Sequence, residues 1–207
     1  MFDTKMKYKI NDKYEIEAES RLALLEQIIL KENIKIEEIV KKTEKIEITD
    51  VRNKMPFKKS NGKMDKRVMD TVVIHHDAEF RPEVYPSLAR YQKEAEFHIS
   101  KGYGHISYHY VIDNVGEIFY CLDETEVAYH CGNYAINLKS LAIKLDGNME
   151  KQNPTEQQIK SLQKLLVWLT TQRPDIPKIL RNSVKGHRDI KATACPGKNL
   201  YPLIHKF

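Results

Sequence analysis

Residues 184–201 read VKGHRDIKATACPGKNLY and hold a histidine and a cysteine eight residues apart in a predicted loop. The pair is His187 and Cys195, and Pro196 and Gly197 follow the cysteine directly. Imidazole and thiolate groups this close along the chain can bind one zinc ion. Because a zinc site that also carries a reactive water usually has three protein ligands, a further ligand must come from elsewhere in the chain.

The missing ligand is expected far upstream, where an apolar run ends in two histidines. Residues 71–77 read TVVIHHD, which is typical of a short buried strand with His75 and His76 at its carboxyl end. Ligands at the ends of strands can hold a metal at the rim of a sheet. Either histidine could complete the set with His187 and Cys195.

The order of three motifs resembles that of the zinc-dependent N-acetylmuramoyl-L-alanine amidases. This amidase type 2 family includes phage amidase-type lysozymes and the peptidoglycan recognition proteins. The motifs are VVIHH at 72–76, ISYHYVIDNVGEIFY at 106–120 and a GHRD–ACPG tail at 186–197. The resemblance covers residues 66–207 and leaves out residues 1–55.

The resemblance implies that His75, His187 and Cys195 bind one Zn²⁺ and leave a fourth position for water. It assigns the metal to the first histidine of the pair, so His76 is expected to line the substrate cleft or to pack at the strand end. The implied reaction is hydrolysis of the amide bond between N-acetylmuramic acid and the L-alanine of the peptidoglycan stem peptide.

Three further residues receive candidate roles from the resemblance. Tyr108 matches the catalytic tyrosine, whose hydroxyl can stabilise an oxyanion, although Tyr110 two residues on makes an aromatic core residue the competing interpretation. Thr193 stands where relatives carry a lysine or a threonine, and it is either a second catalytic donor or a simple loop residue. His130 follows a tyrosine and resembles a substrate-contacting histidine, unless it is merely solvated.

The strand expected at 140–145 departs from the family pattern. Many bacterial and phage relatives carry a glutamate near its end, where this chain has Lys144. We therefore expect no general base from that strand. Because the vertebrate-type relatives also lack this acid, activity does not obviously require it.

The region in front of the motifs reads as a small α+β unit. Residues 6–18 alternate like a hairpin, and apolar residues recur at helical spacing from 22 to 31. We expect residues 1–55 to form this unit, either as a wall- or partner-binding module or as a structural appendage. Residues 56–65 are predicted to be a linker, and residues 66–207 the zinc amidase catalytic domain.

Strands and helices are expected to alternate in the main region, which predicts an α/β domain with a mixed central β-sheet flanked by helices. The expected strands of this region are 68–74, 106–113, 117–121 and 140–145, and a strand at 45–51 is expected in the preceding small unit. The expected helices are one that starts at Pro86 or Ser87 and runs to Ser100, and one capped by Asn153 or Thr155 that runs to 172.

Composition narrows the functional classes. Charged residues make up 30% of the 207 residues and hydrophobic ones 41%, which favours a globular chain over a disordered one. No apolar run reaches membrane-spanning length. The net charge of +5 suits polyanionic partners or an ordinary solvated surface. Because no aromatic-plus-basic platform accompanies it, we do not expect a nucleic-acid partner.

The expected partner is bacterial peptidoglycan, and the expected setting is a phage or prophage endolysin or a bacterial autolysin. The first ten residues carry charges but no apolar core, so we expect no signal peptide, synthesis in the cytoplasm and action on the wall after release. Cys121 and Cys131 are then expected to be reduced. The alternative function is a recognition module that binds peptidoglycan without cutting it, but the presence of Cys195 favours catalysis.

Overall fold

The computed structural model describes residues 6–11, 14–18, 30, 46–79, 88–176, 179 and 183–204. The chain divides into two compact units, residues 1–45 and 46–207. In the first unit, β1 (Met6–Asn11) pairs antiparallel with β2 (Tyr14–Ala18), which confirms the predicted hairpin. The helix predicted from 22 to 31 lies outside the described residues, apart from Leu30.

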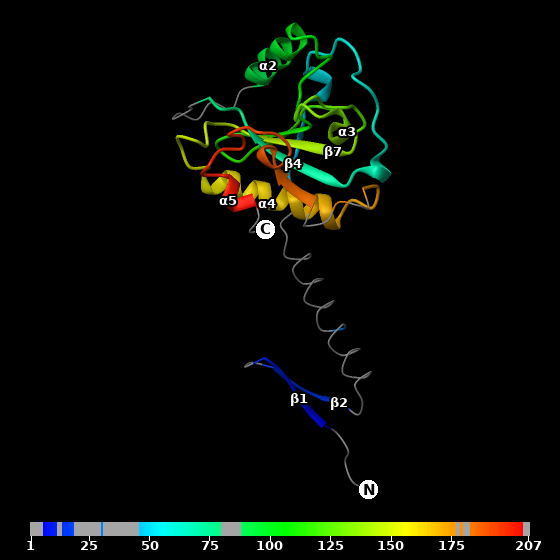
Figure 1. Ribbon diagram of the computed structural model, residues 1–207, viewed down its shortest axis with the longest axis vertical. Helices are drawn as coiled ribbons and strands as arrows, with labels where there is room; N and C mark the ends of the chain where they lie inside the picture. Colours follow the sequence, from blue (N-terminus) through cyan, green and yellow to red (C-terminus); the bar gives the residue numbers. More distant parts are fainter. Residues whose placement is uncertain are drawn as a thin grey trace. The chain divides into compact units, whose positions relative to one another are not determined.

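The second unit is built on a six-stranded mixed sheet in the order β3-β6-β5-β7-β4-β8. Its strands are β3 (Thr49–Asp50), β4 (Thr71–His76), β5 (Tyr110–Ile112), β6 (Ile118–Tyr120), β7 (Ser140–Leu145) and β8 (Val184–Gly186). The neighbouring strands β4 and β7 are labelled in Figure 1. Strand β6 runs antiparallel to β5, and the other neighbours are parallel. The predicted mixed sheet is therefore confirmed.

Four of the five predicted strands are shorter than expected, and for β4 and β5 the local reason is visible. The Asp65 carboxylate accepts the Arg67 N–H at 2.9 Å and caps a short 3₁₀ helix, η2 (Lys66–Val68), so β4 starts only at Thr71. The Ser107 N–H donates to the ring of His98 and not to a neighbouring strand, and β5 starts only at Tyr110. Strand β7 has the predicted bounds.

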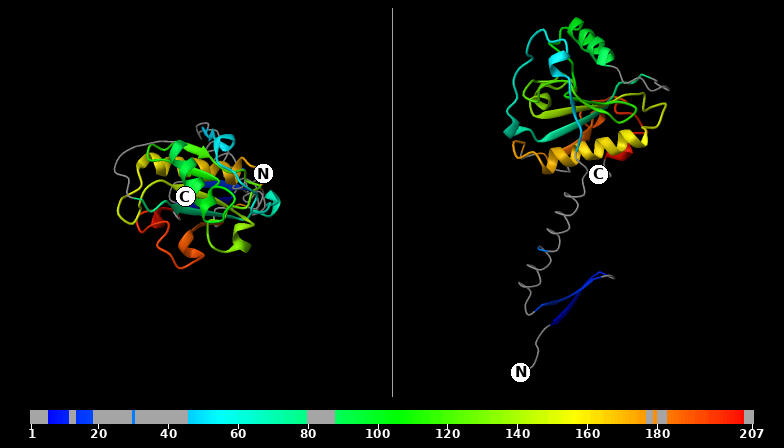
Figure 2. Two further views of the ribbon diagram at one scale, coloured as in Figure 1. Left: turned by 90° about the horizontal axis from the view of Figure 1, so that it is seen from above. Right: turned by 180° about the vertical axis from the view of Figure 1, so that it is seen from behind.

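Helices cover both faces of this sheet. Figures 1 and 2 show α2 over one face and α4 over the other. The helices are α2 (Leu88–Ser100), α3 (Tyr134–Asn137), α4 (Glu156–Thr171) and α5 (Tyr201–Ile204), with 3₁₀ turns η1 (Arg52–Lys54) and η4 (His187–Asp189) besides η2. Within the described parts of the chain, no helix has the length and apolar character needed to span a membrane.

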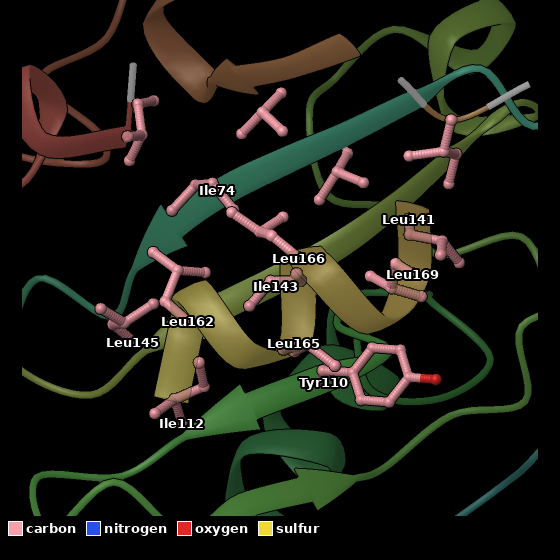
Figure 3. Close-up of a cluster of buried hydrophobic side chains, with 14 of the residues drawn as sticks. Ile74, Tyr110, Ile112, Leu141, Ile143, Leu145, Leu162, Leu165, Leu166 and Leu169 are labelled. Atoms are coloured by element: carbon pink, nitrogen blue, oxygen red, sulfur yellow. The ribbon is translucent and has the colours of Figure 1, made fainter. Parts of the chain in front are cut away.

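Helix α4 supplies most of one core layer. Thr155 begins it with a capping box, in which its hydroxyl accepts the Gln158 N–H and the Gln158 side chain accepts the Thr155 N–H. Leucines at helical spacing then pack against Ile74 of β4 and Ile143 of β7 (Figure 3). These leucines are Leu162, Leu165, Leu166 and Leu169.

The opposite face of the sheet points toward α2. Ala142 and Val111 pack there with Tyr91 and Ala95 of the helix. Since side chains alternate along a strand, Lys144 shares the face of Ala142. His75 of β4 is paired in register with Lys144 of β7, so its side chain leaves the same face of the sheet. The α2 side of the sheet therefore receives the chemically interesting side chains.

Residues 46–65 belong to the second unit and pack against its other elements. Strand β3 pairs with β6, and Val51 and Met64 are buried. Phe57 and Lys63, in the predicted linker, form isolated bridges with His105 and Glu126. The boundary between the compact units thus falls ahead of the predicted linker. The separate folding of residues 66–207 stays a prediction.

Candidate metal centre

Three side chains from distant parts of the sequence meet at one edge of the sheet. His75 ends β4, His187 opens η4 directly after β8, and Cys195 follows in the next loop. Because β4 and β8 are parallel neighbours, their carboxyl ends lie at the same edge. One donor atom of each residue lies within 4.8 Å of the other two, so the cluster could hold a metal ion.

The spacing of these donors fits zinc. His75 Nδ1 lies 3.5 Å from Cys195 Sγ. Zn–N bonds of about 2.0–2.1 Å and a Zn–S bond of about 2.3 Å, at a tetrahedral angle, separate nitrogen and sulfur by about 3.5 Å. Burial raises the pKa of the Cys195 thiol to about 11, and a bound cation would favour the thiolate. Two imidazoles and one thiolate leave a fourth position open.

A chain of hydrogen bonds sets the tautomer of His75. The Ser140 hydroxyl donates to the Ile136 carbonyl at 2.8 Å, so its oxygen accepts from His130 Nε2 at 2.9 Å. His130 Nδ1 then accepts from His75 Nε2 at 3.0 Å. Burial holds the pKa of both rings well below its usual range, so both are neutral. His75 Nδ1 therefore presents its lone pair toward Cys195.

His187 is oriented by a main-chain carbonyl. Its Nε2 donates to the Cys131 oxygen at 3.3 Å, which leaves Nδ1 free to bind a metal. Burial also lowers the pKa of His187, which favours the neutral ligand form. Both histidines thus present Nδ1 to the centre, and each uses Nε2 for support.

His76 is directed elsewhere. Its Nδ1 accepts the Met149 N–H at 3.0 Å, and the side chain is buried. The structure therefore brings His75, and not its neighbour, to His187 and Cys195. Its predicted contact with substrate stays a prediction.

Tyr108 lies beside the ligands, whereas Tyr110 does not. The Tyr108 ring is centred 5.4 Å from the His75 ring, and burial raises the pKa of its hydroxyl, which stays protonated and able to donate. Tyr110 packs in the core under α4 and donates to Glu124 at 2.5 Å. The two tyrosines therefore belong to different layers.

A sequence model of the N-acetylmuramoyl-L-alanine amidases (Amidase_2) matches residues 65–198, which include all three ligands. The chain belongs to this family. The match confirms the resemblance found in the sequence motifs, and the ligand cluster is the metal-binding set of an amidase.

Solved structures agree with this assignment. The endolysin amidase LysCS from Clostridium intestinale is 25% identical, with a TM-score of 0.59 over 76% of this chain and 91% of that one. The peptidoglycan recognition proteins LCa and LCx, solved as an ectodomain complex with tracheal cytotoxin, provide a match at 28% identity. Its TM-score is 0.64 over 77% of this chain and 95% of that one.

Among curated proteins, peptidoglycan-recognition protein SD of Drosophila simulans is 32% identical over 114 residues. The aligned region spans 54% of this chain and 58% of that protein. The chain therefore spans little more than half the length of this relative.

Thr193 of the amidase is exposed and close to the cysteine ligand. Its hydroxyl oxygen accepts the Cys195 N–H at 3.3 Å, which leaves the hydroxyl hydrogen available to donate. The loop is closed by a bond from the Arg188 N–H to the Cys195 carbonyl at 2.9 Å. The role of Thr193 as a catalytic donor stays a prediction.

The sequence motifs missed the residues that support the amidase centre. Ser140 binds His130, which contacts the metal ligand His75, and the expected contact of His130 with substrate stays a prediction. Glu94 of α2 binds Lys144 at 2.6 Å on the ligand side of the sheet. The available signal was the place of Glu94 next to Ala95, on the side of the helix that faces the sheet, since a partly buried carboxylate usually has a specific partner.

Proposed function

We propose that this amidase is zinc-dependent and cleaves the bond between N-acetylmuramic acid and L-alanine in bacterial peptidoglycan. The observation that carries the proposal is the donor set of His75, His187 and Cys195, whose spacing fits tetrahedral zinc with one open position. The position of Tyr108 beside His75 adds an oxyanion donor to the metal centre.

The protein side chains divide the work in this proposal. When bound, zinc would polarise the scissile carbonyl and lower the pKa of water to about 7. Tyr108 donates its hydroxyl hydrogen to the carbonyl oxygen as negative charge develops there. Thr193, at the rim, offers a second donor. His130 and Ser140 keep the His75 ring oriented, so that no reorganisation is needed during the reaction.

The direct test combines metal analysis with product analysis. The purified protein should contain about one zinc per chain. Mass spectrometry of digested peptidoglycan should show free stem peptides that begin with L-alanine and glycan that has lost them. Cys195→Ala should abolish both zinc and products. Intact glycan–peptide linkages with full zinc occupancy would contradict the proposal.

A non-catalytic recognition module is the second candidate, because recognition proteins solved with bound tracheal cytotoxin share this fold. In that case the chain would bind muropeptides at equilibrium without releasing peptide. The presence of a complete ligand set favours the hydrolase. The same digestion experiment separates the two, since a recognition module leaves the substrate intact.

We also propose a biological setting, an endolysin of a phage or prophage or a bacterial autolysin that is made in the cytoplasm and acts on the wall after release. The support is the likeness to the Clostridium endolysin amidase. Lysis of host cells when the protein is produced together with a membrane-permeabilising partner, but not alone, would agree with this setting.

A further inference from the structure

Amide hydrolysis needs a group that takes a proton from the attacking water and returns one to the leaving nitrogen. Strand β7 offers no carboxylate for this task beside the metal centre. The register partner of His75 on β7 is Lys144, and the two side chains leave the same face. The sheet therefore presents a cation next to the metal ligand.

Lys144 is buried and fully paired. Its side chain is 1% exposed, and its ammonium lies 2.6 Å from Glu94 and 3.3 Å from Asp146. Burial alone would lower its pKa, but the two carboxylates raise the pKa overall, so the side chain is charged. A buried ammonium requires such partners. The lysine thus holds Glu94 firmly in one place.

Glu94 comes from the face of α2 that looks onto the site. Tyr91, Glu94 and His98 recur at the spacing of one helical face. The Tyr91 hydroxyl binds Asp146 at 2.9 Å, and the His98 ring is centred 5.9 Å from the Tyr108 ring. Glu94 lies between these two contacts, one turn before the residue that touches Tyr108.

The Lys144 ammonium connects Glu94 to the reaction centre. It lies 5.5 Å from the centre of the Tyr108 ring, and the Tyr108 ring packs against His75. Burial raises the pKa of the Tyr108 hydroxyl most, and the negative charge of Glu94 is the next largest cause. The carboxylate is therefore close enough to Tyr108 for its charge to be felt there.

Other described carboxylates near the centre are already committed to structural contacts. Asp146 is 1% exposed and binds Tyr91 and Arg90. One Asp77 oxygen accepts two backbone N–H groups, at 3.0 and 2.9 Å. Glu150 pairs with Arg188. The Glu94 side chain is 22% exposed, so a water molecule can reach it.

We propose that Glu94 is the general base of this amidase, held in place by Lys144, which rests on the proposed amidase function. Its carboxylate accepts a proton from the attacking water as the water oxygen bonds to the carbonyl carbon. It returns that proton to the alanine nitrogen as the carbon–nitrogen bond breaks. The products are the lactyl carboxylic acid and the free amine, with no proton gained or lost by the enzyme.

The first experiment replaces the carboxylate alone. Glu94→Gln should lower kcat by about 10²-fold or more, the usual contribution of a general base, with KM and zinc content unchanged. Glu96→Gln is the matched control, because Glu96 lies on the same helix and is exposed. Equal effects of the two substitutions would overturn the proposal.

The second experiment separates catalysis from the ion pair. The neutral pair Glu94→Gln/Lys144→Met removes both charges, so no unpaired ammonium is left beside Asp146 and the protein should fold and bind zinc. Its kcat should stay low while its equilibrium affinity for an uncleaved muropeptide matches that of the wild type. Wild-type turnover in the neutral pair would show that Glu94 is structural and would overturn the proposal.

The charge-swapped pair Glu94→Lys/Lys144→Glu places the carboxylate on β7 and keeps the ion pair. Its kcat should be at least tenfold higher than that of the neutral pair, when the two variants are compared at matched zinc content and unfolding midpoint. No recovery at matched zinc content and stability would overturn the proposal. A wild-type protein that binds zinc but cleaves no muropeptide would instead overturn the proposed function and this inference together.

Discussion

His75 Nε2 lies 3.0 Å from His130 Nδ1, on the side of the ring away from Cys195. The chain of donors beyond His130 runs through Ser140 and ends on the Ile136 carbonyl, which can only accept. Every proton in the chain is therefore assigned. The Ile136 carbonyl, three hydrogen bonds away, thus fixes the tautomer in which His75 Nδ1 points its lone pair toward the metal centre.

The first prediction follows from this chain. His130→Ala should weaken zinc binding by about 10- to 100-fold, because it removes the support of a ligand and not the ligand itself. Competition with a chelator measures the affinity directly. His105→Ala is the control, since His105 is a buried histidine that stacks on Phe57 away from the ligands. Unchanged zinc affinity in His130→Ala, with muropeptide binding lost, would favour the substrate role expected from the sequence.

The second prediction separates the two adjacent histidines. His75→Ala should lose zinc and turnover together, as His187→Ala and Cys195→Ala should. His76→Ala should keep zinc, because the His76 ring is engaged with the Met149 N–H. Metal analysis of the four purified variants checks this. Zinc loss from the His76 variant equal to that from the His75 variant would mean that the ligand assignment is wrong.

The third prediction concerns the oxyanion. Tyr108→Phe removes one hydroxyl and keeps the ring that packs on His75, so zinc binding should survive. Turnover should fall by about 10²-fold or more, the usual cost of removing one oxyanion donor. Steady-state kinetics at matched zinc content measures the loss. Wild-type turnover in this variant would make Tyr108 a packing residue.

Thr193→Val provides the comparison for Tyr108. We expect a smaller loss, because Thr193 is exposed and its hydroxyl is less firmly placed. Thr193→Lys should retain or raise turnover, since a cation near the ligands would stabilise developing negative charge. A larger loss from Thr193→Val than from Tyr108→Phe would reverse the order of the two donors.

The fourth prediction concerns the border of the catalytic unit. A fragment that starts at Ile46 should fold and cleave soluble muropeptides. A fragment that starts at Lys63 should be less stable, because it lacks β3 and the buried Val51 and exposes part of the core layer under α2. Urea unfolding compares the two. Equal stability would show that residues 46–62 contribute little, as expected for a linker.

The fifth prediction is loss of stability in acid. Burial lowers the pKa of His109 to about 4, while an unfolded histidine titrates near 6.5. As pH falls from about 6.5 to 4, the unfolded chain therefore takes up a proton that the folded one does not, and the free energy of unfolding decreases. The stabilisation that comes from keeping His109 neutral is fully present above about pH 6.5. Its loss levels off below about pH 4, where the folded chain takes up the proton too.

Urea unfolding of the zinc-free protein at pH 7 and pH 5 tests this linkage without competition from the metal. His109→Gln should reduce the difference between the two pH values, while it can still accept the Ala142 N–H that His109 Nδ1 accepts at 3.0 Å. An unchanged pH dependence in that variant would assign the acid sensitivity to other histidines.

The sequence alone determined the parts of this protein whose signals are local. The run VVIHH and the strand at 140–145 are apolar enough to be buried whatever surrounds them, and Thr155 with Gln158 at the correct spacing begins α4 by contacts within one turn. The order of the metal motifs also sufficed to predict a ligand set of His187, Cys195 and one histidine of the adjacent pair, because their chemistry is tied to residue type.

Only the tertiary structure decided which member of each adjacent or alternating pair faces the metal. His75 and His76 are equivalent in the sequence, and the register of β4 against β7 and β8 separates them. Tyr108 and Tyr110 should share a face at strand period, but β5 begins only at Tyr110, so Tyr108 lies outside the regular strand. The contacts of His130 with Ser140 and of Glu94 with Lys144 join separate elements, so no local pattern encodes them. A hydrogen bond or an ion pair depends on where the partner lies in space, and the sheet sets that position.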